Sequence, residues 1–132
     1  MGKPLKLLLD THALLWWWKD DARLSARAAA AIADDTHTVL VSAASAWEIA
    51  TKYRIGKLPG AEVALRDFND LIVADGFTHL AVSYQHALKA GGFDSAHRDP
   101  FDRMLAAQAL IEGATLVTDD AVMNVFAAKC LW

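Results

Sequence analysis

Short, largely apolar runs recur along the chain and alternate with segments of helical pattern. A strand that is apolar at every position is buried on both faces, which is typical of a parallel sheet covered by helices. The runs predict strands at 5–9, 38–41, 78–82, 114–118 and, more weakly, 129–131. We therefore expect an α/β protein, a three-layer α/β/α sandwich with a four- or five-stranded parallel sheet.

The segments between these runs have the spacing of helices. The expected helices are 11–18, 25–33, 43–55, 62–75, 84–90, 100–112 and 121–127. Gly56 and the pair Gly91 and Gly92 are expected to end helices. Pro100 at the start and Gly113 at the end of one segment show the asymmetry that is typical of a helix.

Length and composition narrow the class of protein. A chain of 132 residues with 55% hydrophobic residues predicts one domain, residues 1–132, with a buried core. Its single cysteine, Cys130, excludes an internal disulfide, and its apolar runs are too short for a signal peptide or a membrane span. We expect a cytoplasmic protein without a membrane. With a net charge of −3, it would need a local basic patch or a metal ion to bind nucleic acid.

Acidic residues stand at the ends of two expected strands. Asp10 directly follows the first strand, and Asp119 and Asp120 follow the fourth. Parallel sheets form their sites at the carboxyl ends of the strands, near the topological switch point, so we expect these acids to share a site. The alternative role is helix capping. Thr11 could cap the first helix in place of Asp10, and two adjacent acids need only one cap.

A further acid, Glu48, lies in the segment SAASAWEIATKYRIGKL. Its structural alternatives are a capping box with Ser45 and an ion pair with Lys52 one turn later. Ser42 is the better cap because it directly follows the strand, and this places Glu48 well inside the helix. Ser45, Glu48 and Lys52 then share one face, and Trp47 lies on another.

The last acid, Asp102, lies in the segment HRDPFDRMLAAQAL. Asp99, just before Pro100, is a good N-cap, and Asp102 in the first turn also favours the helix dipole. Beyond that turn the helix is apolar on nearly every face, so we expect it to be deeply buried. A carboxylate on its first turn is then expected to face a pocket rather than bulk solvent.

Carboxylates that converge on one edge of a sheet repel each other, and they stay ionised together only if a cation compensates them. Oxygen ligands without a Cys or His cluster suit Mg²⁺ or Mn²⁺ rather than zinc. The histidines show no ligand spacing, and we expect surface or packing roles for them. They are His12, His37, His79, His86 and His97.

Four segments, in this order, resemble one known family. They are LLLDTHALLW, SAASAWEIATKYRIGKL, HRDPFDRMLAAQA and LVTDD. Over essentially its full length, the chain resembles the PIN-domain ribonucleases, and among them the VapC-type toxins of toxin–antitoxin pairs. The resemblance implies a PIN-like fold, a homodimer, a cognate antitoxin as partner, and hydrolysis of RNA by a Mg²⁺- or Mn²⁺-dependent endoribonuclease.

The resemblance also implies roles for individual residues. The family's catalytic acids map to Asp10, Glu48, Asp102 and Asp120. The metal ligands would be Asp10, Asp102 and Asp120, with Glu48 and Asp119 as further candidates. Thr11 or Thr118 would help to order water. The candidates for holding RNA phosphates are Lys52, Lys57, Arg98 and Arg103.

Other acid-rich folds match the motifs less well. A two-component receiver domain needs paired acids after the first strand and another after the third, but here the first strand ends in one Asp and the third in VSY. A haloacid-dehalogenase-type phosphatase needs D-x-D where this chain has Asp10, Thr11 and His12. The remaining alternative is a catalytically silent PIN-like scaffold that acts by partner binding. Such a scaffold is expected to lack an acid, and none is missing.

Three consecutive tryptophans, Trp16, Trp17 and Trp18, occupy the first helix. Successive helical residues point about 100° apart, so we expect one or two of the rings in the core and at least one exposed. We expect this helix, with the helix of residues 42–53, to form part of a groove for an antitoxin helix. The alternative is simple core packing.

Overall fold

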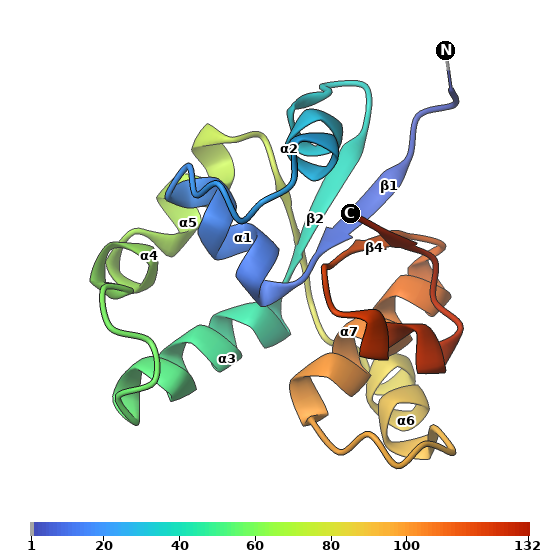
Figure 1. Cartoon of the computed structure of the whole chain (residues 1–132). Helices are drawn as coiled ribbons and strands as arrows, with labels where there is room; N and C mark the ends of the chain where they lie inside the picture. Colours follow the sequence, from blue (N-terminus) through green and yellow to red (C-terminus); the bar gives the residue numbers. More distant parts are fainter. Residues whose placement is uncertain (1) are drawn as a thin grey trace.

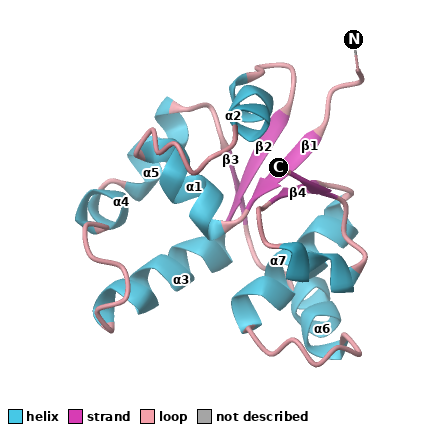
Figure 2. Ribbon diagram, viewed as in Figure 1, coloured by secondary structure: helices cyan, strands magenta, loops and turns pink. Residues whose placement is uncertain are grey.

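The structure is a computed structural model, and it describes residues 2–132. Its sheet has five parallel strands in the order β3-β2-β1-β4-β5 (Figure 2). The strands are β1 (Lys6–Leu9), β2 (Thr38–Ser42), β3 (Thr78–Leu80), β4 (Thr115–Val117) and β5 (Cys130–Leu131). The predicted parallel sheet is therefore confirmed, in its five-stranded form.

Helices cover both faces of this sheet (Figure 1). One face carries α1 (Thr11–Trp18), α2 (Ala26–Ala33), α3 (Ala43–Arg54), α4 (Glu62–Arg66) and α5 (Phe68–Ala74). The other face carries α6 (Tyr84–Gly92), α7 (Pro100–Glu112) and the 3-10 helix η1 (Ala121–Phe126). This arrangement confirms the three-layer α/β/α sandwich.

The central strand β1 supplies both cores. Leu7, Leu8 and Leu9 have no exposed surface, and successive strand side chains point to opposite faces. Leu7 and Leu9 therefore pack into the core under α1 to α5, whereas Leu8 packs with Leu105 and Leu116 in the core under α7. A strand that is buried on both faces must be apolar at every position, which is why the run is unbroken.

The order of the strands fixes where a site can form. The chain runs from β1 outward to β2 and β3, and then returns to β4 on the other side of β1. The topological switch point therefore lies between β1 and β4, whose carboxyl ends carry Asp10 and Asp119. The backbone N–H of Asp10 donates to the carbonyl of Val117 at 3.1 Å, which ties the end of β1 to β4.

Three features of the helices and strands differ from the prediction. The segment 62–75 is two helices, because Asp67 ends α4 with a hydrogen bond to Val63 and begins α5 by accepting one from Leu71. Gly91 and Gly92 lie in the last turn of α6 rather than beyond its end. Strand β3 is an exposed edge strand rather than a buried one. Within residues 2–132, no helix combines the length and the apolar character that a membrane crossing requires.

Candidate active site

The first turns of α1 and α3 lie side by side at the carboxyl edge of the sheet (Figure 1). A cavity of about 440 Å³ opens there. The cavity gathers acidic residues that are far apart in the sequence. Its lining residues are Asp10, Thr11, His12, Glu48, Lys52, Asp99, Asp102, Asp119 and Asp120. The structure thus brings together every carboxylate that the motifs nominated, and it adds Asp99.

Asp10 is held rigidly at the start of α1. Its Oδ1 accepts a hydrogen bond of 2.7 Å from the backbone N–H of Ala13, so Asp10, and not Thr11, is the N-cap. The pKa of Asp10 is raised to about 6, chiefly by burial and to a small extent by the charge of Asp119, while hydrogen bonds with Thr118 and Ala13 and the charge of His12 act in the other direction. A cap uses one carboxylate oxygen, so the capping role leaves Oδ2 for another partner.

Glu48 is buried, with 4% of its surface exposed, and both of its oxygens have partners. The Thr11 hydroxyl donates to Oε1 at 2.5 Å, and the ammonium of Lys52 pairs with Oε2. Ser42 caps α3 as predicted, by accepting from the N–H of Ala44. The ion pair with Lys52 is therefore real, and it lies inside the acidic cavity rather than on the outer surface.

Lys52 has the environment of a counter-ion. Burial lowers its pKa, but the hydrogen bond and the charge of Glu48, together with the charges of Asp99 and Asp102, outweigh burial and raise the pKa. The ammonium thus points into the carboxylate cluster. In this arrangement Lys52 balances acids, and it does not extend toward solvent as an RNA contact would.

Asp102 lies on the first turn of α7, opposite Glu48. Asp99 caps that helix as predicted, accepting from the N–H groups of Phe101 and Asp102. Asp102 Oδ2 lies 2.9 Å from Nε2 of His97. Burial raises the pKa of Asp102, and the charges of Asp99 and Glu48 add to this, while the hydrogen bond with His97 opposes it. From the sequence we expected a surface or packing role for His97, and no motif indicated this contact.

Asp119 and Asp120 have different surroundings. Asp120 Oδ1 accepts from the N–H of Val122 at 3.0 Å and caps η1, and its own N–H donates to the Thr118 hydroxyl at 3.1 Å. Asp120 is therefore the one cap that two adjacent acids need. Both side chains are exposed, and the charge of Asp119 acts on Asp10. Buried Thr118 links the two strand ends, because it also hydrogen-bonds Asp10.

The predicted RNA contacts divide into two groups. Lys57 and Arg98 are exposed and remain available for a phosphate. Arg103 does not fit this role, because its guanidinium is used to hold the chain between α6 and α7. It donates to the backbone carbonyls of Ala90, Gly91, Phe93, Ser95 and His97, at 2.8–3.4 Å.

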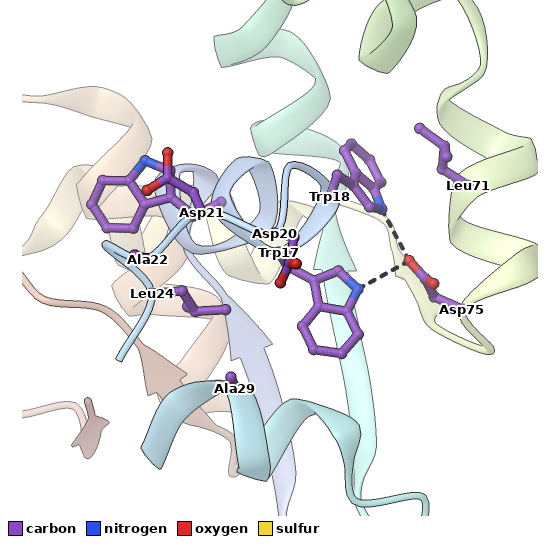
Figure 3. A pocket seen from close by; sticks show the side chains of 10 residues that line it. Trp17, Trp18, Asp20, Asp21, Ala22, Leu24, Ala29, Leu71 and Asp75 are labelled. Atoms are coloured by element: carbon purple, nitrogen blue, oxygen red, sulfur yellow. Dashed lines mark hydrogen bonds between the residues drawn. The ribbon is translucent and has the colours of Figure 1, made fainter. Parts of the chain in front are cut away.

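The tryptophan run also differs from the prediction. Trp16, Trp17 and Trp18 are all half-buried, and none of them is exposed. The indole N–H groups of Trp17 and Trp18 both donate to Oδ2 of Asp75, at 3.1 and 3.0 Å. The rings of Trp17 and Trp18 therefore meet at Asp75, just after α5 (Figure 3), and the groove shared with α3 stays a prediction.

The acidic cavity fits a divalent metal ion in its chemistry. It offers carboxylates and a hydroxyl but no thiol, which suits Mg²⁺ or Mn²⁺. Among residues 2–132, no three His, Cys, Asp or Glu side chains are placed to hold one metal ion together. In this structure Glu48 pairs with Lys52, and Asp102 pairs with His97.

Comparison with protein families matches residues 7–129 to the PIN domain. Ribonuclease VapC16 of Mycobacterium tuberculosis is 42% identical over 57 residues, which are 43% of this chain and 40% of that protein. The matched region thus spans less than half of this curated relative.

Two solved structures share the fold over nearly all of their length. They are VapBC2 from Rickettsia felis bound to a promoter DNA fragment, and VapBC-1 from nontypeable Haemophilus influenzae. The first has a TM-score of 0.71 at 15% identity and covers 96% of this chain and 98% of that one. The second has a TM-score of 0.66 at 16% identity and covers 96% and 97%.

Proposed function

The chain belongs to the PIN-domain family, and from this premise we propose that it is a metal-dependent endoribonuclease, the toxin of a toxin–antitoxin pair. The observation that carries the proposal is the acidic cavity. One cavity is lined by Asp10, Glu48, Asp102 and Asp120 together. The partial match to a ribonuclease supports the same activity. The proposed place of action is the cytoplasm.

Asp10, Asp102 and Asp120 would hold Mg²⁺ or Mn²⁺, with Glu48 and Asp119 as further ligands. When bound, the ion supplies an activated water and a positive charge for the phosphodiester. We place Asp120 before Asp119 as a ligand, because its carboxylate and its backbone N–H are both held in place. A carboxylate fixed by a hydrogen bond loses less conformational freedom on binding than one that is not fixed.

The other residues of the site position these acids. Thr11 and Lys52 hold the two oxygens of Glu48, and Thr118 connects Asp10 to Asp120. Carboxylates fixed in this way can accept hydrogen bonds from a water and set its direction of attack. The exposed cations Lys57 and Arg98 would contact RNA phosphates outside the cavity.

We also propose a protein partner and a dimer. The similar solved structures are named VapBC, and VapC-type toxins occur in toxin–antitoxin pairs. This supports an antitoxin as the partner. The homodimer follows from the family resemblance. Exposed apolar side chains on α6 and α7, among them Tyr84, Leu88 and Ile111, offer surface for such contacts.

The experiment is an RNA cleavage assay on the purified protein, freed of any partner and supplied with total cellular RNA. Cleavage should require Mg²⁺ or Mn²⁺, stop with EDTA, and vanish in Asp10→Asn and Asp102→Asn. Asp70→Asn, which removes an exposed acid outside the cavity, is the control and should cleave normally. Cleavage that survives EDTA, or wild-type protein that never cleaves, would favour the silent scaffold instead.

A further inference from the structure

A second cavity, of about 640 Å³, lies between α1, α2 and α5 (Figure 3). Its size is in the range of known ligand pockets. All three tryptophans line it, with Leu24 and Leu71 as further apolar walls. It is distinct from the acidic cavity, because the two share no lining residue, although His12 of the acidic cavity packs on Trp16 with ring centroids 5.6 Å apart.

Asp75 is the central polar group of this cavity. Its Oδ2 accepts from the indole N–H groups of both Trp17 and Trp18 (Figure 3). These donors are neutral, and among residues 2–132 Asp75 forms no ion pair. The part of the chain that the structure describes gives its other oxygen, Oδ1, no hydrogen bond either. Asp75 is an exposed residue, so its carboxylate is accessible from the cavity and, in the described part of the chain, has no ion-pair partner.

The aromatic rings around Asp75 are held in place. Trp17 packs against Phe77 with ring centroids 6.0 Å apart, and Trp18 meets Phe68 edge-on at 5.4 Å. Each ring is also fixed by its hydrogen bond to the same carboxylate oxygen. Two indoles and a carboxylate therefore form a preorganised cage, which lowers the entropic cost of binding a ligand.

The same cavity already shows which ligand such a set of groups accepts. The guanidinium of Arg23 lies 5.1 Å from the ring centroid of Trp16, and it donates from Nε and Nη2 to the two oxygens of Asp21. An indole face and a carboxylate thus bind one guanidinium at the rim. Trp17, Trp18 and the exposed Asp75 offer the same kinds of group at another part of the cavity.

The neighbouring surface indicates that the ligand is part of a polypeptide. A smaller hollow of about 220 Å³ between α1 and α4 is lined mainly by apolar side chains, including Leu15 and Val63. The two hollows share Trp18 and Leu71 as lining residues. One extended segment could therefore place an apolar side chain in the smaller hollow and a basic one in the larger.

We propose that Trp17, Trp18 and Asp75 form a cage for an arginine side chain of a partner polypeptide, which also inserts an apolar residue between α1 and α4. That this partner is the antitoxin rests on the proposed function. Asp20 and Asp75 border the cavity and favour a basic segment, whereas Asp21 is already paired with Arg23. The chemistry of the cage is independent of any nuclease activity.

The test is an NMR titration of the metal-free, ¹⁵N-labelled protein, in which the indole N–H signals of Trp17 and Trp18 are followed. The probe is acetyl-arginine amide, and the matched probes are the amides of acetyl-citrulline, which is neutral, and acetyl-lysine. Arginine should give saturable shifts of both signals. Binding should be at least tenfold weaker for citrulline and for the Asp75→Asn variant, and unchanged for Asp70→Asn on the same helix.

Equal shifts with citrulline, or unchanged affinity in Asp75→Asn, would overturn the cage. Lysine binding as tight as arginine would overturn the assignment to a guanidinium. Because the titration uses neither RNA nor metal, its result is separate from the cleavage assay. A protein that binds arginine amide but cleaves no RNA would keep the cage and lose the nuclease, and the reverse result would do the opposite.

Discussion

The hydroxyl of Thr11 donates a hydrogen bond of 2.5 Å to Oε1 of Glu48, and so joins the first turn of α1 to the middle of α3. Both residues are buried, with 4% of their surface exposed. Lys52 holds the second oxygen of Glu48. The carboxylate of Glu48 is therefore fixed in orientation at the wall of the acidic cavity. The first two predictions concern its two partners, Thr11 and Lys52.

Thr11→Val keeps the shape of the side chain but removes the hydrogen bond to Glu48. We expect it to lower the free energy of unfolding by about 1–3 kcal/mol, because a buried charged acceptor loses its donor. Thr11→Ser keeps the hydroxyl and should retain most of the stability. Urea denaturation of the two variants measures the difference. Equal losses in both would show that packing of the methyl group, and not the hydrogen bond, matters at this position.

Lys52→Met should bind Mn²⁺ more tightly than the wild type, because it removes a positive charge from the cavity. A unit charge at close range in water is worth about 1 kcal/mol, or roughly fivefold in affinity. The variant should be less stable without metal, since Glu48 loses its counter-charge. Lys57→Met, on an exposed site, is the control for both measurements. Weaker Mn²⁺ binding in Lys52→Met would contradict the counter-ion role.

Asp10→Asn should stabilise the metal-free protein at high pH. The pKa of Asp10 is about 6 in the folded protein against 3.8 for an unperturbed aspartate, so the folded state binds more protons between these values. The stability from Asp10 is therefore lost as pH rises through this range, by about 3 kcal/mol at most. Asn also caps helices well. In thermal unfolding with EDTA, the variant should have a higher unfolding temperature than the wild type at pH 8. Below about pH 4 the two unfolding temperatures should be equal.

If Asp10→Asn raised the unfolding temperature equally at both pH values, the cause would not be the ionisation of Asp10. A variant that is less stable at pH 8 would show that the Asp10 charge is compensated within the protein.

Arg103→Lys should destabilise the fold, because an ammonium cannot reproduce five hydrogen bonds that a planar guanidinium makes to the chain between α6 and α7. The expected loss is about 2 kcal/mol or more in chemical denaturation. Arg98→Lys, on an exposed residue, should leave stability unchanged. If Arg103→Lys weakened only the binding of RNA and left stability intact, the earlier assignment to phosphate contact would be correct.

The sheet and its acids were predictable because their signals are local. Leu7, Leu8 and Leu9 are apolar since both faces of β1 are covered, and parallel strands bring Asp10 and Asp120 to one edge. Ser42 and Asp99 were predictable as caps for the same reason, because a cap bonds to its own helix. The break at Asp67 was not, since both short helices have the same apolar spacing.

Contacts between distant segments could not be read from local pattern. The contact between His97 and Asp102 crosses the turn that contains Pro100. Arginine is usually a surface residue, so nothing in the sequence indicated that backbone carbonyls surround the guanidinium of Arg103. The role of Asp75 depends on how α5 returns beside α1, and no motif contains it. The roles of Asp102 and Asp120 as metal ligands stay predictions.

The most direct test of the account is equilibrium binding of Mn²⁺ to the metal-free protein, followed by electron paramagnetic resonance. The cavity joins Asp10, Glu48, Asp102 and Asp120 at the edge of the sheet. We predict saturable binding in the wild type that is lost in Asp10→Asn and in Asp102→Asn and kept in Asp70→Asn. A wild-type protein that binds no Mn²⁺, or variants that bind it equally well, would contradict a metal site at this cavity.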